Sequence, residues 1–265
     1  MLDVIKDMYK GYSIILTGCR ALNLNYECCE YDIIILEDCK EEVIKIDDMY
    51  IEVHKLSNNK IDKVMQLYKA EIIQDPHLTL ASLLKYLDMD MLKMHAKDLL
   101  IDAMLDASYA KNNLNALEGS FLLKRSAYKY LSAMLVFNKI KPSPLHILTQ
   151  LRELDLDLTL PFECLGVKHA NSSSIIRACN MLYQLTNSRL VSKKLLYLYE
   201  RQKYVDCSLY LTYIGINQAN YSKIIDKLRV LMNLNIDQGL IKQQSKLLLE
   251  ECKSMLKKYF NNHTL

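Results

Sequence analysis

The chain has 265 residues, a length that fits one large domain or two of ordinary size. Only 6 Gly and 4 Pro interrupt it, whereas 51 % of its residues are apolar. Folds that turn often, such as β-sandwiches and propellers, need more Gly and Pro, and a disordered chain would be less apolar. The composition therefore predicts a long, mostly helical globular protein.

The N-terminal residues and the cysteines bear on where the protein works. The first ten residues carry two Asp and no small-residue cleavage site, and no stretch approaches the roughly 20 apolar residues of a membrane helix. We therefore expect a cytoplasmic protein with no membrane partner. The eight cysteines include no CxxC pair, and a disulfide-stapled domain would be smaller and denser in Cys. Reduced, packed thiols are expected, since adjacent Cys28 and Cys29 lack the further ligands of a zinc site.

The net charge of +3 conceals an uneven distribution along the chain. Residues 1–75 carry 9 Lys and Arg against 15 Asp and Glu, whereas residues 76–265 carry 25 against 16. The first part is therefore acidic and the second basic, which suggests that the two parts do different jobs. The basic part fits either a polyanionic ligand or an ordinary solvated helical surface.

Short β-branched apolar runs recur in the first 75 residues and predict strands. These runs span residues 12–17, 31–36, 43–46 and 50–53. Helical spacing precedes the first run at residues 3–10 and follows the last at residues 61–73. Residues 1–75 are therefore predicted to form a small α/β domain with a mixed sheet.

From residue 76 onward the apolar residues follow helical spacing, and the pattern predicts no strand. One helix is predicted around residues 99–105 and a longer one from 119 to at least 135. Further helices are predicted over residues 145–151, 173–185, 191–213, 221–232 and 239–259, with a break near residues 161–174. The expected fold class is α+β: a small mixed-sheet α/β domain (1–75) followed by a larger all-α helical bundle (76–265).

One segment of the acidic part carries a pattern that points to chemistry. The apolar run 14–17 ends at Gly18, and the next run begins with Glu30 and Asp32. Alternation along a strand places these two acids on one face, at the edge where the strand enters the core. Paired carboxylates near a glycine turn with free backbone N–H groups could hold a divalent metal and a phosphate chain together.

A third acid follows on a later predicted strand. Glu52 stands among apolar residues, where a carboxylate is unfavourable unless a cation meets it. If this strand lies beside that of Glu30 and Asp32, three carboxylates converge, and Mg²⁺ is the natural partner for them. His54 shares the face of Glu52 and is either a flanking group or an ordinary exposed histidine. A purely structural protein would leave the three acids far apart.

The order of these features resembles the DNA polymerase beta-like nucleotidyltransferase superfamily. Residues 17–21 resemble its glycine turn, Glu30 and Asp32 its metal-binding pair, and Glu52 its third acid, so the resemblance covers residues 12–56. It implies that the three carboxylates are catalytic and bind one or two Mg²⁺ ions. A nucleoside monophosphate would then move from an NTP to an acceptor, with Gly18 and Cys19 holding phosphate oxygens.

Two residues depart from the family pattern and leave a second function open. Cys19 stands where Ser or Gly is usual, and Glu30 stands where Asp is commoner. The family also contains members without catalysis. The alternative function is therefore a degenerate nucleotidyltransferase-like protein that acts as a nucleotide-binding or protein-interaction module.

Basic residues supply further candidates for contacts with the nucleotide. Arg20 either touches a phosphate or pairs with a nearby acid. Arg125 and Lys129 are i, i+4 neighbours on a predicted helix and point the same way, toward either a triphosphate or solvent. No motif names the acceptor, which leaves RNA, a small molecule and a protein as candidates.

Overall fold

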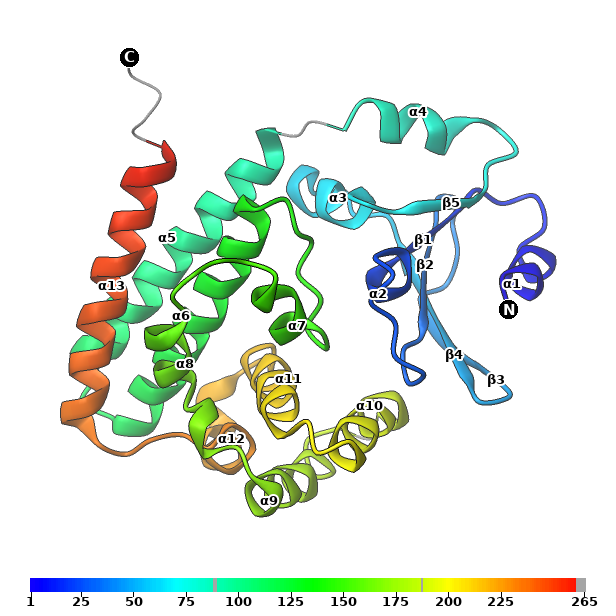
Figure 1. The fold of residues 1–265 in the computed structure, drawn as a ribbon. Coiled ribbons are helices and arrows are strands. Elements are labelled where there is room, and N and C mark those ends of the chain that lie inside the picture. The colour runs from blue at the N-terminus through cyan, green and yellow to red at the C-terminus, as the bar shows by residue number, and fades with distance from the viewer. Residues whose placement is uncertain (88–89, 187, 261–265) are drawn as a thin grey trace. The chain divides into compact units, whose positions relative to one another are not determined.

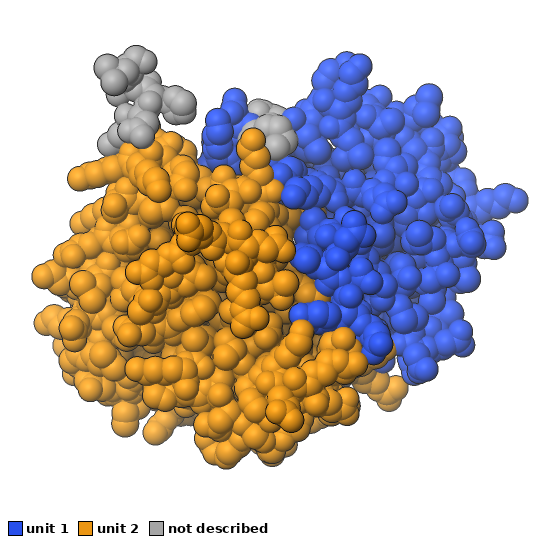
Figure 2. Space-filling model, viewed as in Figure 1, with its two compact units in different colours: residues 1–94 blue, residues 95–265 orange. Residues whose placement is uncertain are grey.

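The computed structural model describes residues 1–87, 90–186 and 188–260. The chain divides into two compact units, Met1–Met94 and His95–Leu265 (Figure 2). The sequence pattern puts the boundary at residue 75, whereas helix α4 (Thr79–Lys85) belongs to the first unit. The reason is that Leu80 of α4 is buried in the same apolar cluster as Ile15 and Ile34.

The first unit is built on a mixed sheet of five strands in the order β3-β4-β2-β1-β5 (Figure 1). The parallel pair is β2 with β4, and the other neighbours are antiparallel. The α+β class and the four predicted strands are confirmed, and β2 lies at the centre. The strands are β1 (Ile14–Thr17), β2 (Tyr31–Ile35), β3 (Glu42–Ile46), β4 (Met49–Lys55) and β5 (Glu71–Gln74).

Helices cover both faces of this sheet. Ile5 of α1 (Leu2–Met8) is buried with Ile33 and Val53 on one face. On the other face, Leu67 of α3 (Lys60–Leu67) is buried with Ile34 and Leu80. Successive residues of β2 therefore enter opposite clusters, as strand alternation requires. A four-residue helix, α2 (Gly18–Ala21), follows β1 directly.

The helix predicted over residues 61–73 is too long. Helix α3 ends at Leu67, and Lys69 adopts a positive φ of 54° that reverses the chain. Residues 71–74 then pair with β1 as the edge strand β5. The apolar spacing continues across this turn because Ile72 and Ile73 happen to extend the helical pattern, so periodicity alone does not reveal the strand.

The second unit is helical, and none of the described helices is long and apolar enough to cross a membrane. Figure 1 shows α5, α6 and α13 as long helices running beside one another. The hydroxyl of Ser126 on α6 donates to the carbonyl of Ala103 on α5 at 2.6 Å, which fixes one of these pairings. The helices are α5 (Asp90–Asn112), α6 (Ala116–Phe137), α7 (Ile147–Arg152), α8 (Thr159–Leu165), α9 (Ser172–Leu182), α10 (Arg189–Glu200), α11 (Tyr204–Ile216), α12 (Ile225–Met232) and α13 (Gln238–Phe260).

Two details of this unit differ from the sequence prediction. The helix expected over residues 191–213 is divided into α10 and α11, and Gln202 makes the turn between them with a φ of 55°. The break expected near residues 161–174 contains most of α8, because Pro161 is its third residue, where no backbone N–H is needed for a helical bond.

Several turns of the chain use left-handed backbone at residues other than glycine. A positive φ at such residues is uncommon because the side chain crowds the carbonyl. Four of these residues are neither Asn nor Asp, the types that tolerate this conformation best. The described residues of this kind are Asn23, Asp47, Lys69, Leu78, Lys139, Gln202, Asn220 and Asn233.

Candidate metal centre

Two carboxylates and an imidazole meet on one face of the first unit's sheet. Asp32 and Glu52 are register partners on the parallel strands β2 and β4, so their side chains leave the same face side by side. His54 lies two residues further along β4 and shares that face. One ligand atom from each residue lies within 4.8 Å of the other two. This group is a three-ligand cluster set by strand register.

The cluster is open to solvent at the point where β2 enters the core. The side chains of Asp32, Glu52 and His54 are 15 %, 34 % and 35 % exposed. Residues 33–35, which follow Asp32, are buried, as the sequence predicted for this strand. Two of the three predicted carboxylates, Asp32 and Glu52, therefore converge, as expected if their strands are neighbours.

Gly18 fits against the carboxylate of Asp32. Its φ is +68°, in the left-handed region that favours glycine. A Cβ added there would overlap the Asp32 carboxylate and would lie 2.7 Å from Cγ of Asp32. The turn after β1 can therefore approach this carboxylate only because residue 18 has no side chain.

The negative charges around His54 stabilise its charged form. Its Nε2 lies 3.8 Å from Oδ1 of Asp32 and 4.0 Å from Oε1 of Glu52. Interaction with Asp32 is the largest cause that raises the pKa of His54, and Glu52 and Glu41 act in the same direction, whereas burial opposes them. The surroundings of the cluster therefore favour cations.

Glu30 and Arg20 are near this cluster in the sequence but are not among its ligands. Glu30 is 5 % exposed and is not one of the three grouped ligands. Arg20 donates from Nε to the carbonyl of Glu30 at 3.0 Å and from a terminal nitrogen to the carbonyl of Cys29 at 2.7 Å. Its guanidinium also lies 4.1 Å from the ring centroid of Tyr31. Arg20 thus fixes the chain where it enters β2.

The thiol of Cys19 is hydrogen-bonded to the thiol of Cys29. Cys19 is only 6 % exposed. The pKa of its thiol is well above the ordinary value, mainly because of the hydrogen bond with Cys29 and secondly because of burial. The thiol therefore stays protonated at neutral pH. A ligand at the glycine turn would therefore meet the backbone of Cys19 and not a thiolate.

Arg125 and Lys129 lie in the second unit and bind acids of α5. Arg125 donates to both carboxylate oxygens of Asp106, at 2.8 and 2.5 Å. Lys129 lies 3.0 Å from Asp102 and 3.1 Å from Asp106. The two cations do share one side of α6, as predicted, and their contact with a nucleotide stays a prediction.

The three grouped side chains offer two carboxylates, which suit a hard divalent cation, and one imidazole, which is a softer ligand. Carboxylate oxygens are the ligands that Mg²⁺ takes, and Asp32 and Glu52 supply them side by side on adjacent strands. An imidazole nitrogen is a more usual ligand for zinc or iron. From the sequence, His54 is either a group that flanks the site or an ordinary exposed histidine. Its position two residues after Glu52, on the same strand face, is the pattern that indicates the first.

Comparison with known proteins adds no second line of evidence. No protein-family model matches the chain, and no curated protein is similar to it in sequence.

Proposed function

We propose that the protein is a metal-dependent nucleotidyltransferase of the polymerase beta-like type, which moves a nucleoside monophosphate from an NTP to an acceptor. The observation that carries the proposal is the convergence of Asp32 and Glu52, as register partners, beside the Gly18 turn. A catalytic centre of this type needs carboxylates on adjacent strands and a backbone that approaches phosphate without a side chain in between.

The residues of the cluster have distinct tasks in this proposal. Asp32 and Glu52 hold the cation, and the backbone of Gly18 and Cys19 binds phosphate oxygens. When bound, Mg²⁺ supplies charge neutralisation on the phosphates and lowers the pKa of the attacking hydroxyl. Glu52, the more exposed of the two carboxylates, orients the acceptor for in-line displacement. The cytoplasm, where NTPs and reduced thiols occur together, is the proposed compartment.

A second candidate function is supported by the position of Glu30. A residue that is 5 % exposed and outside the three-ligand group leaves the centre with one carboxylate fewer than the family pattern. The alternative is a degenerate member that binds nucleotide, or a protein, without turnover. The acceptor (RNA, small molecule or protein) is part of the first proposal only.

The deciding experiment measures Mg²⁺-dependent NTP binding and transfer of labelled NMP to RNA, small-molecule and protein acceptors. We expect Asp32→Asn and Glu52→Gln each to lower transfer by about a thousandfold, since each removes a charge that binds the cation. Asp38→Asn is the matched control, because Asp38 is 95 % exposed and follows the opposite end of β2.

The outcomes separate the two candidate functions. Transfer by the wild type, lost in both site variants and kept in Asp38→Asn, supports the enzyme. Mg²⁺-dependent NTP binding without transfer to any acceptor supports the degenerate module. NTP binding that neither Mg²⁺ nor Asp32→Asn alters contradicts both.

A further inference from the structure

The second unit contains a cavity of about 500 Å³ that the proposed function does not use. Four segments surround it: α6, the α8–η1 junction, where η1 is Val167–His169, the end of α12 with its following loop, and the start of α13. Ligand pockets are commonly of this size. The cavity is therefore large enough for a whole small molecule.

Cationic side chains dominate the charge around this cavity. Lys124 comes from α6, Lys168 comes from η1 and Arg229 comes from α12, whereas Glu163 is the one carboxylate among the lining residues. Lys168, His169 and Arg229 are exposed, so they stand at the rim. Elements far apart in the sequence thus bring three positive charges to one cavity, an arrangement that would attract an anion.

Lys124 differs from the rim residues because it is only 4 % exposed. Its ammonium group donates to the carbonyl of Leu165, the last residue of α8. An ammonium group has three N–H donors, so one carbonyl leaves capacity for further acceptors. Burial also lowers the pKa of Lys124 to about 8. The cavity therefore contains a buried cation that an incoming anion would stabilise.

Gly166 makes room for this ammonium group. It ends α8 in the left-handed conformation, with a φ of +69°. A Cβ at residue 166 would lie 3.2 Å from Nζ of Lys124, closer than side chains ordinarily approach. Glycine at this position therefore keeps space around the nitrogen on the side of the cavity.

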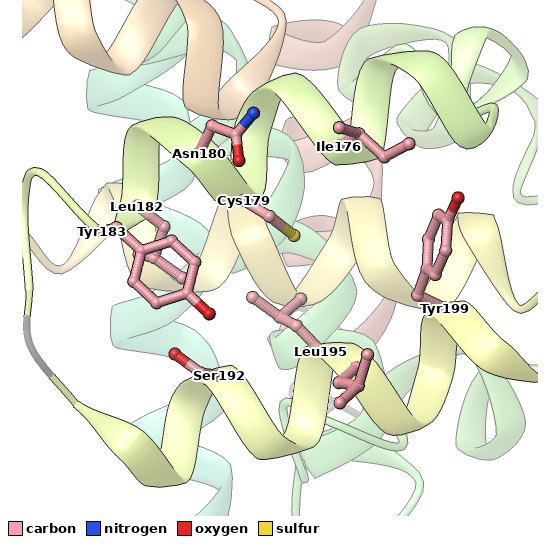
Figure 3. Close-up of a pocket in the computed structure, with 9 residues that line it drawn as sticks. Ile176, Cys179, Asn180, Leu182, Tyr183, Ser192, Leu195 and Tyr199 are labelled. Carbon is pink, nitrogen blue, oxygen red and sulfur yellow. The ribbon is translucent and has the colours of Figure 1, made fainter.

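A second cavity of the same unit has the opposite chemistry. Figure 3 shows Cys179 and Leu195 facing each other between α9 and α10, in a pocket of about 210 Å³. Its lining includes Ile176 and Tyr199 and no charged residue. The gathering of Lys124, Lys168 and Arg229 thus distinguishes the larger of these two cavities from the smaller one.

We propose that the larger cavity binds the phosphate group of a small organic phosphate. Lys124 is the buried anchor of that group, and Arg229 and Lys168 hold its outer oxygens. A phosphate suits the site because it carries up to two charges and accepts many hydrogen bonds. The volume exceeds that of a phosphate, and the amides of Asn235 and Gln244 on the wall are available to the organic part.

The test uses pyrophosphate as the probe, titrated calorimetrically into the full chain with EDTA present. We expect binding at one site, weakened about tenfold by Arg229→Ala and by Lys168→Ala, and about a hundredfold by Lys124→Met. Lys246→Ala is the matched control, since Lys246 is exposed on α13 and does not line the cavity. It removes the same charge from the unit.

This result does not depend on the proposed enzyme activity. Asp32→Asn should leave metal-free pyrophosphate binding unchanged, because Asp32 belongs to the first unit. If Lys124→Met does not fold, the rise in melting temperature with pyrophosphate, measured for the Arg229→Ala and Lys168→Ala variants, decides. No binding by the wild type, or equal binding by Arg229→Ala, Lys168→Ala and Lys246→Ala, overturns the proposal.

Discussion

The two compact units gather opposite charges by different structural means. In the first unit, the backbone register of two neighbouring strands brings Asp32 and Glu52 together on an open sheet face. In the second, separate helical segments bring Lys124, Lys168 and Arg229 around one cavity. A site built on register has its members fixed by hydrogen-bonded backbone, whereas one built between helices depends on side-chain packing. The two should therefore respond differently to substitution.

Among substitutions that test this comparison beyond the metal ligands themselves, the largest effect is expected from Gly18→Ala in the first unit. A Cβ there overlaps the Asp32 carboxylate and occupies left-handed backbone, so either the turn or the carboxylate must move. We expect nucleotidyl transfer to fall by at least about a hundredfold and stability by roughly 1–3 kcal/mol. Transfer rates and urea unfolding measure the two effects.

Gly11→Ala is the matched control for this substitution. Gly11 also has a positive φ, of +88°, but a Cβ at that position would meet nothing within 4 Å. It should lose stability and keep its transfer activity. Equal losses of activity in the two variants would show that backbone strain, and not access to Asp32, explains the effect.

The next effect concerns Arg125 in the second unit. Arg125 donates two hydrogen bonds to Asp106, which is 4 % exposed. We therefore expect Arg125→Met to lower the free energy of unfolding by roughly 2 kcal/mol. The loss is not larger because Lys129 still neutralises part of the Asp106 charge. Asp106→Leu combined with Arg125→Met should recover most of the loss, since no buried charge is then left without its partner. Urea unfolding of the single and double variants measures this.

NTP binding by the same variants tests the sequence prediction for Arg125. If the double variant regains stability and still binds NTP like the wild type, Arg125 has a packing role. A loss of NTP binding in the stable double variant would instead support the predicted contact with the nucleotide.

A smaller effect depends on pH and on Lys124. Burial lowers the pKa of Lys124 from the ordinary 10.5 to about 8, so the unfolded chain binds more protons than the folded chain between these values. The cost of burying the charge is full below pH 8 and disappears as the pH rises toward 10.5. Relative to Lys124→Met, the wild type should therefore gain about 2 kcal/mol of stability between neutral pH and about pH 10.

This comparison cancels the other groups that titrate at high pH, since they are common to both proteins. Unfolding by urea without added anions, at several pH values, gives the difference. A difference that stays constant over this range would mean that Lys124 keeps its ordinary pKa, and its ammonium group would then not be the desolvated cation that a phosphate should stabilise.

The sequence predicts the first unit well because local patterns determine it. β-branched runs locate β1 to β4, and the paired acids before a buried run locate the edge where Asp32 lies. What it misses are features that depend on partners. β5 forms only because residues 71–74 find β1, and His54 joins the cluster because β4 lies beside β2 in one particular register.

The cation-lined cavity was not predictable in the same way. Lys124 and Arg229 are separated by more than a hundred residues, and no pattern in the sequence links them. Lys124 lies next to the candidate Arg125 in the sequence, yet Lys124 is buried and donates to the carbonyl of Leu165, whereas Arg125 pairs with Asp106. Adjacent residues on a helix point in different directions, so only the packed helices distinguish them.

The non-glycine residues with positive φ are positions where substitution could raise the stability of the protein. Leu78, which is 71 % exposed, and Lys139 and Gln202 occupy backbone that glycine or asparagine would adopt with less strain. Replacing them should leave both candidate sites unchanged, because none of the three residues lines the metal centre or the cavity. The scarcity of glycine that first indicated a helical protein thus also marks where a more heat-resistant variant could be designed.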